Sequence, residues 1–536
     1  MRRVKTKEET IVKEKEKRER KKETAHTLAM KQREISIAEF FTKNRHLLGF
    51  DNPQKALLTT VKEAVDNSLD ACEDAATLPS IRVLIEGLAE DRYRITVEDN
   101  GPGIVKKQIP MIFARLLYGS KFHTLKQSRG QQGIGISAAG LYAQLTTGKP
   151  VRITSKISPD KPAHYYELMI DTSRNKPVIV TDTKVQWNAA HGTMVELEIE
   201  ASYKKGKRSV DDYIQQTTLA NPHAEFFYKP PKDDLLHYPR ISETLPEDTL
   251  EIKPHPYGVE LGVLINMLKD SKARNIRKML IGEFSRVSAR VADEILQKAE
   301  INPSIRPGKL SNGDTERLYR AIQNVKIMSP PTNCIAPIGE NLVFKGLQER
   351  VQADFYTSCT RPPSVYRGNP FQVEIGLAYG GEMPADEQIE VMRFANRVPL
   401  LYQQSACAIT KSILSTDWKH YGLQQPKGSL PVGPVALFVH IASVWVPFTS
   451  ESKEAIAHYP EIIRETRLAL QECGRRLSAH IKRHIRVQEE HKKRSYIERY
   501  IPHIGEALQL ILAFSDKQKE RTITNLKDIL QKSRKM

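Results

Sequence analysis

The glycine-rich stretch RGQQGIGISAAGLYAQ, residues 129–144, constrains the fold of this chain more than any other segment. From Gly133 onward it reads G-x-G-x-x-A, the spacing with which a dinucleotide-binding fold holds pyrophosphate. That fold requires an apolar strand immediately before the glycines and an acidic residue roughly 20 positions further on. The segment KFHTLKQSRGQQ that precedes these glycines is polar and typical of a loop. We therefore expect the glycines to hold phosphates in another architecture.

A predicted helix upstream carries a polar stripe that suits such a site. In VKEAVDNSLDAC, four polar residues recur at i, i+3, i+4 and i+7 and so share one helix face: Glu63, Asp66, Asn67 and Asp70. The opposite face is apolar and comprises Val61, Ala64, Val65, Leu69 and Cys72. On an isolated helix, a solvated face would explain the stripe. The neighbouring VEDNGPGI favours a functional interpretation, because a strand there ends at Asp99 before glycines that permit close backbone approach.

These residue types match what a nucleoside triphosphate needs from a protein. Asp99 can accept the exocyclic amine of adenine, Asn67 with waters can hold Mg²⁺, and Glu63 can orient or deprotonate an attacking water. The glycines at 130, 133 and 135 would offer backbone N–H groups to phosphates. ISAAGLYAQ would begin a helix whose N-terminus favours anions. This is phosphate binding without a Walker A sequence, which does not occur at the site.

The chain divides into regions of different pattern. Residues 1 to about 35 form a charged arm, and residues 40–228 read as helices on one face of a mixed sheet, with a helix break at Asn52-Pro53. KPPKDD marks a seam near Pro231, before a helical segment that ends in NPSIRPGKLSNGD. Further strands follow, such as FQVEIGLAYGG, MRFANRVPLLY and GPVALFVHIASVWVPF. A long charged helix, about Lys453 to Tyr496, and a basic tail complete the pattern.

Charge and cysteine content limit the partners and the compartment. The 536 residues include 82 Lys plus Arg against 64 Asp plus Glu, and the formal net charge of +18 favours a polyanionic partner such as nucleic acid. A solvated, salt-laced surface explains the charge equally well. Five cysteines without a CxxC pair predict neither a disulfide framework nor a zinc site and indicate a reducing compartment. With no apolar run of membrane-spanning length, we expect a cytoplasmic, nucleoid-associated protein without a membrane segment.

The blocks around Glu63, Asp99 and the glycines resemble the N, G1 and G2 boxes of the GHKL ATPases. This superfamily contains gyrase B subunits, MutL proteins, heat-shock ATPase chaperones and histidine kinases. HGTMVELEI resembles the later box of that fold. A closer resemblance is to the B-subunit family of archaeal topoisomerase VI, a type IIB DNA topoisomerase. It rests on blocks from residue 35 to about 475: EISIAEFFTKNRHLLGFDNPQKALLTTVKEAVDNSLDA, YGSKFHTLKQSRGQQGIGISAAGLYAQ, YRGNPFQVEIGLAYGG, RFANRVPLLYQQSACAIT and VWVPFTSESKEAIA.

The resemblance implies an α+β multidomain fold. A GHKL (Bergerat) ATP-binding α/β sandwich is expected at 35–228, with Ile35 to about Asn52 as an N-terminal strap. It is followed by a helix-two-turns-helix domain at 229–307. A transducer domain at 308–500 would contain a left-handed βαβ crossover and a long C-terminal helix that reaches the A subunit of topoisomerase VI. The charged arm at 1–34 and a basic tail at 501–536 lie outside these domains.

The resemblance also assigns site residues. Glu63 would be the general base for ATP hydrolysis, Asn67 the Mg²⁺ ligand, and Asp99 the reader of adenine together with Thr193. A transducer lysine, for which Lys427 in QQPKGSLPVGP is the candidate, would contact the γ-phosphate. The other expected nucleotide contacts are the loop glycines Gly101 and Gly103, the pair Ser120 and Lys121, and a phosphate lid of Gly130, Gln131, Gln132, Gly133, Ile134, Gly135, Ile136 and Ser137.

The implied function is that of the ATP-hydrolysing component of a topoisomerase that relaxes or decatenates duplex DNA by ATP-gated double-strand passage. The A subunit would cleave the DNA within an A₂B₂ heterotetramer, and ATP would close two B subunits through the strap. Basic runs such as GRRLSAHIKRHIRVQEEHKKR suit contacts to DNA phosphates rather than bases. Alternatives are a MutL-like or chaperone-like GHKL clamp, and a DNA-binding scaffold with a dead nucleotide site. A sensor histidine kinase is disfavoured, because the N-terminal arm shows no acceptor-histidine helix.

Overall fold

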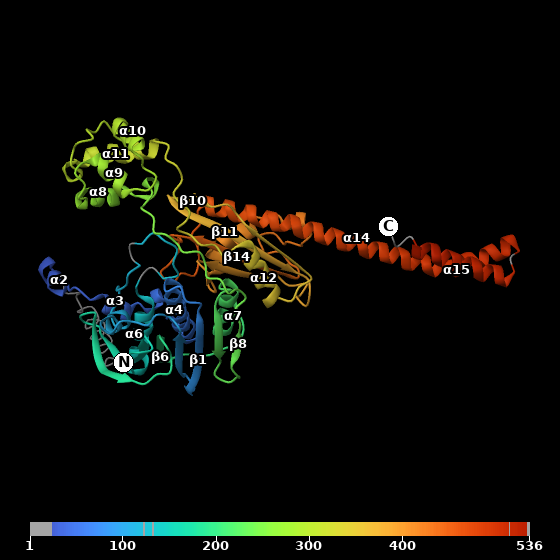
Figure 1. The fold of residues 1–536 in the computed structure, drawn as a ribbon, viewed down its shortest axis with the longest axis horizontal. Helices are drawn as coiled ribbons and strands as arrows, with labels where there is room; N and C mark the ends of the chain where they lie inside the picture. The colour runs from blue at the N-terminus through green and yellow to red at the C-terminus, as the bar shows by residue number, and fades with distance from the viewer. Residues whose placement is uncertain (1–23, 122–123, 131–132, 514, 533–536) are drawn as a thin grey trace, which may run out of the picture.

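The computed structural model describes residues 24–121, 124–130, 133–513 and 515–532. It contains two β-sheets, a helical bundle set apart from both, and a long helix that projects from the second sheet (Figure 1). The predicted α+β multidomain class is therefore confirmed. Residues 1–23 of the predicted arm at 1–34 lie outside the described residues. From there the chain forms α2 (Ala25–Lys31) and α3 (Ile37–Lys43).

The first sheet has eight strands and mixed direction. Its strand order is β5-β4-β3-β6-β2-β1-β7-β8, in which β1 pairs with β7 in parallel and the other neighbours are antiparallel. The strands are β1 (Ser80–Ala89), β2 (Arg92–Asp99), β3 (Val151–Lys156), β4 (Ala163–Asp171), β5 (Lys176–Val185), β6 (Gly192–Glu200), β7 (Glu225–Lys229) and β8 (Leu236–Tyr238). Register places Asp99 opposite Thr193, so two of the predicted site residues meet at one end of neighbouring strands.

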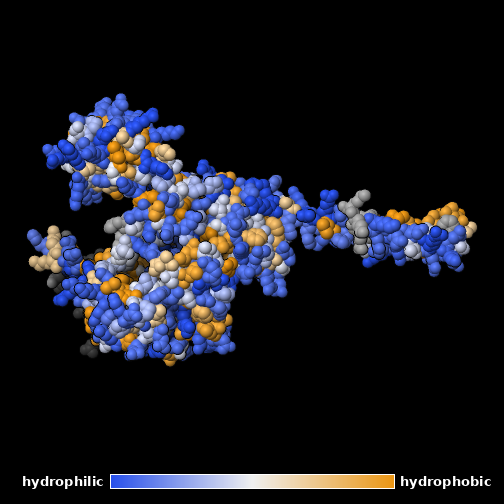
Figure 2. Space-filling model, in the orientation of Figure 1, coloured by the Kyte–Doolittle hydropathy of each residue, from blue (hydrophilic) through white to orange (hydrophobic). Residues whose placement is uncertain are grey.

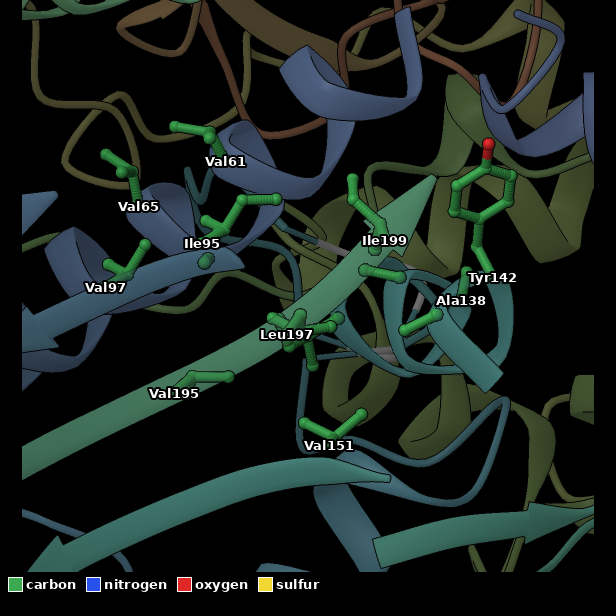
Figure 3. Close-up of a cluster of buried hydrophobic side chains, with 14 of the residues drawn as sticks. Val61, Val65, Ile95, Val97, Ala138, Tyr142, Val151, Val195, Leu197 and Ile199 are labelled. Atoms are coloured by element: carbon green, nitrogen blue, oxygen red, sulfur yellow. The ribbon is translucent and has the colours of Figure 1, made fainter. Parts of the chain in front are cut away.

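Helices α4 (Pro53–Asp74) and α6 (Gly135–Thr147) cover one face of this sheet, as predicted. The side chain of Asn52 accepts a hydrogen bond from the Lys55 N–H and Pro53 occupies the first turn, so the expected break starts the helix. Alternating strand residues such as Leu197 share one apolar core with Val61 of α4 and Ala138 of α6 (Figure 3). Smaller helices α5 (Ile109–Phe113) and α7 (Val210–Ala220) complete the layer.

The segment KPPKDD is not a domain seam. Strand β8 pairs antiparallel with β7, with Phe227 opposite His237. KPPKDD is therefore the connection of a hairpin, and the first sheet continues past the predicted boundary at 228. Its Pro and Asp residues suit a turn as well as they suit a linker, which is why the pattern pointed to the wrong kind of loop.

The helical segment forms a bundle with its own apolar core. It comprises α8 (Leu261–Asp270), α9 (Ile276–Glu283), α10 (Ala289–Ala299) and α11 (Asn312–Asn324). The core runs from Val259 to Ile327, so the expected boundary at 307 falls inside the bundle. The loop chemistry of NPSIRPGKLSNGD ends in a capping box, in which Ser311 and Asp314 start α11.

The second sheet is buried on both faces. Its six strands are β9 (Phe355–Thr360), β10 (Ser364–Tyr366), β11 (Asn369–Tyr379), β12 (Glu390–Ala395), β13 (Val398–Pro399) and β14 (Val435–Ser443). Strands β12 and β14 are parallel neighbours, and the chain between them forms α13 (Ala408–Leu414), which makes a βαβ crossover. Helices α13 and α14 (Pro460–Leu512) pack on one face, whereas α12 (Glu340–Arg350) and α7 pack on the other. Burial on both faces explains the continuous apolar run of β14.

Helix α14 spans Pro460–Leu512, whereas the predicted helix began near Lys453 and ended near Tyr496. Its first part packs on the second sheet through Ile462, Leu470 and Leu477, and the rest projects away with largely exposed side chains (Figure 2). Pro502 lies inside the helix, so the expected tail boundary at 501 falls within α14. Helix α15 (Asp516–Lys532) folds back along it.

Two predicted absences concern membranes and disulfides. Within the described ranges, no helix is both long and apolar enough to cross a lipid bilayer. All five cysteines are free and buried.

The first core yields a stability prediction. Leu197 is fully buried, so Leu197→Ala should lower the free energy of unfolding by about 2–5 kcal/mol, because it removes apolar contacts and leaves a cavity. Leu88 in β1 is 41% exposed, and Leu88→Ala serves as the control, with an expected change below about 0.5 kcal/mol. Thermal and denaturant unfolding would measure both. Equal losses in the two variants would contradict the assignment of this core.

Candidate active site

Both sheets contribute walls to one cavity of about 700 Å³. The first half of the molecule supplies α4, the end of β2 with its following loop, and the glycine-rich loop before α6. The second half supplies Leu401, Tyr402 and the turn at 451–454. The cavity therefore lies where a change in the relative position of the two halves would alter its shape.

Asp99 lines the cavity at the carboxyl end of β2. It is buried, and its Oδ1 accepts hydrogen bonds from the backbone N–H of Gly101 at 2.9 Å and of Thr193 at 3.1 Å. Its Oδ2 accepts a hydrogen bond from the Ser68 hydroxyl at 3.0 Å. Burial raises the pKa of Asp99, although these three donors oppose the shift. The carboxylate is thus held rigidly with acceptor capacity left over for an amine in the cavity.

The loop after Asp99 needs its glycines. Gly103 has a φ of +69°, and a Cβ built there would meet the backbone oxygen of Lys156 at 2.1 Å. At Gly101, a Cβ would come within 3.0 Å of the Asp99 carboxylate. Gly103 lines the cavity, while Gly101 contributes its N–H to Asp99. Both predicted glycines are therefore needed for the conformation of the loop beside Asp99.

Glu63 and Asn67 lie on the cavity side of α4. The Lys62 Nζ is 3.3 Å from the Glu63 Oε1. Desolvation raises the pKa of Glu63, but the charges of Lys62 and Lys453 outweigh it, and the net pKa is below the ordinary value. Glu63 is therefore ionised at neutral pH, the form that can accept a proton from water. Asn67 is exposed to the cavity, with its side chain free to reach a ligand there.

The other two members of the predicted stripe have structural partners. Asp66 is buried and does not line the cavity; it accepts a hydrogen bond from the Tyr213 hydroxyl of α7 at 3.0 Å. Asp70 lines the cavity but pairs with Lys121 at 2.8 Å and with Arg129 at 2.8 Å. Of the four residues predicted to share one helix face, Glu63 and Asn67 are thus available to a ligand in the cavity. Asp66 and Asp70 are engaged in contacts with other parts of the protein.

The glycine-rich loop passes directly over Glu63. A Cβ on Gly135, at the start of α6, would lie 1.7 Å from the Glu63 Oε2, so a larger residue there would displace the Glu63 carboxylate. Gly133 has a φ of +58°, which glycine adopts without strain. Gly130, Gly133, Ile134, Gly135 and Ile136 line the cavity, whereas Ser137 is buried and donates to the Ile134 carbonyl. The predicted lid residues Gln131 and Gln132 lie outside the described residues.

Arg129 ties this loop to α4. Its guanidinium is buried and pairs with Asp70 and, at 2.7 Å, with Glu73; it also donates to the Asn221 side chain. Burial raises the pKa of Glu73, but Arg129 more than reverses the shift and holds it well below the usual range, with help from His223. The loop is thus fixed at its entry by paired charges removed from water.

Ser120, Lys121 and Thr193 also line the cavity. Lys121 bridges Asp70 and Asp74, the latter at 3.1 Å. The Thr193 hydroxyl lies 3.1 Å from the hydroxyl of Ser155.

Lys427 is not brought to the cavity. It is exposed in the loop before β14 and forms no part of the cavity wall. The lysine that enters from the second half is Lys453, whose ammonium donates to the Arg129 carbonyl at 3.1 Å. Desolvation lowers the pKa of Lys453, and Glu63 partly opposes this shift. The signal for Lys453 was present in VWVPFTSESKEAIA, but a loop position gave no reason to choose it among the many lysines.

The site suits a metal ion that is bound jointly by the protein and a ligand better than one bound by protein side chains alone. No group of three or more His, Cys, Asp or Glu residues suited to a metal ion occurs in the part of the chain that the structure describes. Asn67 offers a single amide oxygen on the cavity side of α4. Mg²⁺ commonly takes one or two protein oxygens and completes its shell with waters and phosphates, so these residues fit it.

Comparisons with known proteins agree with this arrangement. Residues 52–175 match the model described as "Histidine kinase-, DNA gyrase B-, and HSP90-like ATPase", and residues 330–493 match "Topoisomerase VI B subunit, transducer". The chain is 51% identical to the B subunit of type 2 DNA topoisomerase 6 from Methanococcoides burtonii, over 90% of this chain and 78% of that protein. It is 46% identical to that of Archaeoglobus fulgidus, over 94% of this chain and 84% of that protein. It is 37% identical to that of Thermococcus gammatolerans, over 90% of this chain and 93% of that protein.

The buried charges at Arg129 yield a prediction with a pH dependence. Arg129→Gln should destabilise the protein by about 3 kcal/mol near neutral pH, because it leaves Glu73 with only His223 and the more distant Arg397. A carboxyl whose folded pKa is depressed contributes stability above its unfolded pKa and loses it as the pH falls. In the variant this depression is lost, so the deficit relative to the unmodified protein should shrink as the pH falls between about pH 5 and pH 3.

Thermal unfolding at both pH values would measure this change. Arg129→Lys retains a positive charge and should lose less stability at neutral pH. A deficit for Arg129→Gln that is independent of pH would contradict the role given to the Glu73 carboxylate.

Proposed function

Because this chain belongs to the topoisomerase VI B-subunit family, and is thus the ATPase subunit of a type IIB topoisomerase, we propose that it binds and hydrolyses ATP in the cavity between α4 and the turn at 451–454. The observation that carries the proposal is the convergence of Glu63, Asn67 and Asp99 in one cavity that a lysine enters from the second half. The transducer match at 330–493 separates this function from that of a MutL-like or chaperone-like clamp.

Each wall of the cavity has a role in this proposal. Asp99 accepts a hydrogen bond from the adenine amine, with Thr193 beside it. Asn67 would hold Mg²⁺, which neutralises phosphate charge when bound. Glu63 lies beside the glycine loop, where the N–H groups and the N-terminus of α6 favour phosphate. There it would orient the attacking water and accept its proton.

Lys453, rather than Lys427, is our candidate for the γ-phosphate contact. Its positive charge acts on Glu63 across the cavity, and it is carried by the second half of the molecule. A point charge on the γ-phosphate would lose its partner when phosphate leaves, which would release the turn at 451–454. Hydrolysis would in this way alter the position of the second sheet.

The finer assignments from the family are also proposals. They comprise a helix-two-turns-helix identity for the α8–α11 bundle, a left-handed β12–α13–β14 crossover, and double-strand passage in an A₂B₂ assembly in which the A subunit cleaves duplex DNA. Exposed apolar side chains of the strap, namely Ile35, Ile37, Phe40 and Leu47, support ATP-dependent pairing of two B subunits through this segment. Lys and Arg on the projecting part of α14 support contacts to DNA phosphates, although pairs such as Arg486 with Glu490 use part of that charge.

The role of Glu63 predicts binding without turnover. Glu63→Ala should lower the rate of ATP hydrolysis roughly 100- to 10,000-fold, because the water loses its general base, while nucleotide binding is retained. Hydrolysis by the purified chain would be measured alone and with duplex DNA and the A subunit, and binding with a non-hydrolysable analogue. Glu90→Ala, at an exposed position after β1, is the control. Unimpaired turnover by Glu63→Ala would remove Glu63 from its role.

The two lysines give opposite predictions. Lys453→Ala should lower kcat by about 100-fold, the size expected for loss of one donor to developing charge. Lys427→Ala should stay within about twofold, as is usual for an exposed side chain away from a site. Both would be assayed for DNA-stimulated ATP hydrolysis. A large loss for Lys427→Ala together with none for Lys453→Ala would reverse the assignment.

A further inference from the structure

The turn that carries Lys453 is fastened to α4 by a buried ion pair. The Glu454 Oε1 lies 2.5 Å from the Lys55 Nζ, and the side chains are only 8% and 10% exposed. Lys55 also pairs with Asp51 at 2.9 Å, and its ammonium lies 5.3 Å from the centre of the Tyr402 ring. This group joins the first turn of α4 to the second half of the molecule at the edge of the cavity.

Lys453 itself adopts a backbone conformation that its surroundings must enforce. Its φ is +53°, in the left-handed region that a residue with a side chain occupies at a cost of about 1 kcal/mol or more. Its N–H closes the turn by donating to the Ser450 carbonyl at 3.1 Å. The foot of the turn is held by Thr449 and Ala455 and by the bridge between Phe448 and Ile456. These bonds all belong to the second half, so they fix the turn without aligning it to the cavity.

Glu454 supplies that alignment. It is the residue directly after Lys453, and its partner Lys55 lies on the same helix as Glu63 and Asn67. Because α4 is one continuous helix, an anchor at Lys55 fixes the turn relative to Glu63 two turns further along. Desolvation lowers the pKa of Lys55, but the carboxylates of Glu454 and Asp51 outweigh it and the net pKa is raised, so the ammonium stays charged.

We infer that Lys55 and Glu454 are positioning residues, which hold Lys453 at the cavity and thereby set the rate of hydrolysis without contacting the nucleotide. The inference rests on the proposed function, since it takes Lys453 as the phosphate contact. Breaking the pair would free the turn to move relative to α4. Lys453 would then reach the phosphate in only a fraction of molecules, and kcat would fall while nucleotide binding through Asp99 and α4 would persist.

The test is a double-mutant cycle in the full chain, with ATP hydrolysis as the assay. Glu454→Gln and Lys55→Met should each lower kcat about tenfold, with a change in KM of less than about threefold. In a Lys453→Ala background, neither change should lower kcat further, because the positioned group is already absent. Glu294→Gln, which removes one partner of the exposed pair with Lys298 in the helical bundle, should leave kcat unchanged.

Combining Lys55→Met with Glu454→Gln guards against misfolding, because it leaves no buried charge unpaired. This double variant should fold and should show the same loss of kcat as the single variants. An equal loss of kcat with and without Lys453 would overturn the inference, since the pair would then act on the protein generally. An unchanged kcat in all of the pair variants would also overturn it. If the unmodified chain fails to hydrolyse ATP, the proposed function fails instead, and the two failures are thus distinguishable.

Discussion

The cavity depends on the ion pairs that the guanidinium of Arg129 forms with Asp70 and Glu73. Arg129 precedes the glycine loop, and its two carboxylate partners project from α4. The glycine loop and the helix that bears Glu63 are therefore joined by charge as well as by the packing of Ile134 on the first core. Lys453 donates to the carbonyl of the same arginine, so the second half of the molecule meets the first at this residue.

Buried polar contacts continue from Arg129 into the second sheet. Arg397 lies 3.9 Å from Glu73, and its backbone N–H donates to the His440 ring, which bonds Glu374 at 2.7 Å. Glu374 in turn accepts the N–H groups of Ile338 and Gly339, which lead into α12. Such a network gains little stability over an apolar interface, because each charge loses its hydration. It does require one alignment of the two halves, since a displaced partner would leave a charge buried and unpaired.

Local patterns in the sequence predicted the parts of the site that lie on single elements. The spacing of Glu63 and Asn67 on one helix, and the position of Asp99 at a strand end, were sufficient to bring them to one cavity, and the resemblance identified the family. Their chemical roles, like the strap and the DNA contacts, stay predictions. Contacts between distant segments could not be read in this way. Asp66 turns to Tyr213 because α7 packs beside α4, which no helical period reveals.

Loops were the weakest part of the sequence prediction. Lys427 and Lys453 both lie in polar loops of the second half, and only the packing of that sheet on the first places one of them in the cavity. KPPKDD and NPSIRPGKLSNGD read as boundaries, because Pro, Gly and Asp mark turns inside a domain as well as linkers between domains. The crossover strands β12 and β13 read as one strand, but Asn396 and Arg397 have positive φ and divide them.

The projecting helix turns small movements into large ones. Beyond Ile481, which packs against the second core, about 30 residues of α14 extend for about 45 Å. A rotation of the sheet by about 10° would carry the far end of such a rod by roughly 8 Å, which is more than a full helical turn. Displacements of the sheet too small to break its own packing would thus be magnified at the tip. The projecting part of α14 therefore acts as a lever arm, which amplifies rotations of the second sheet.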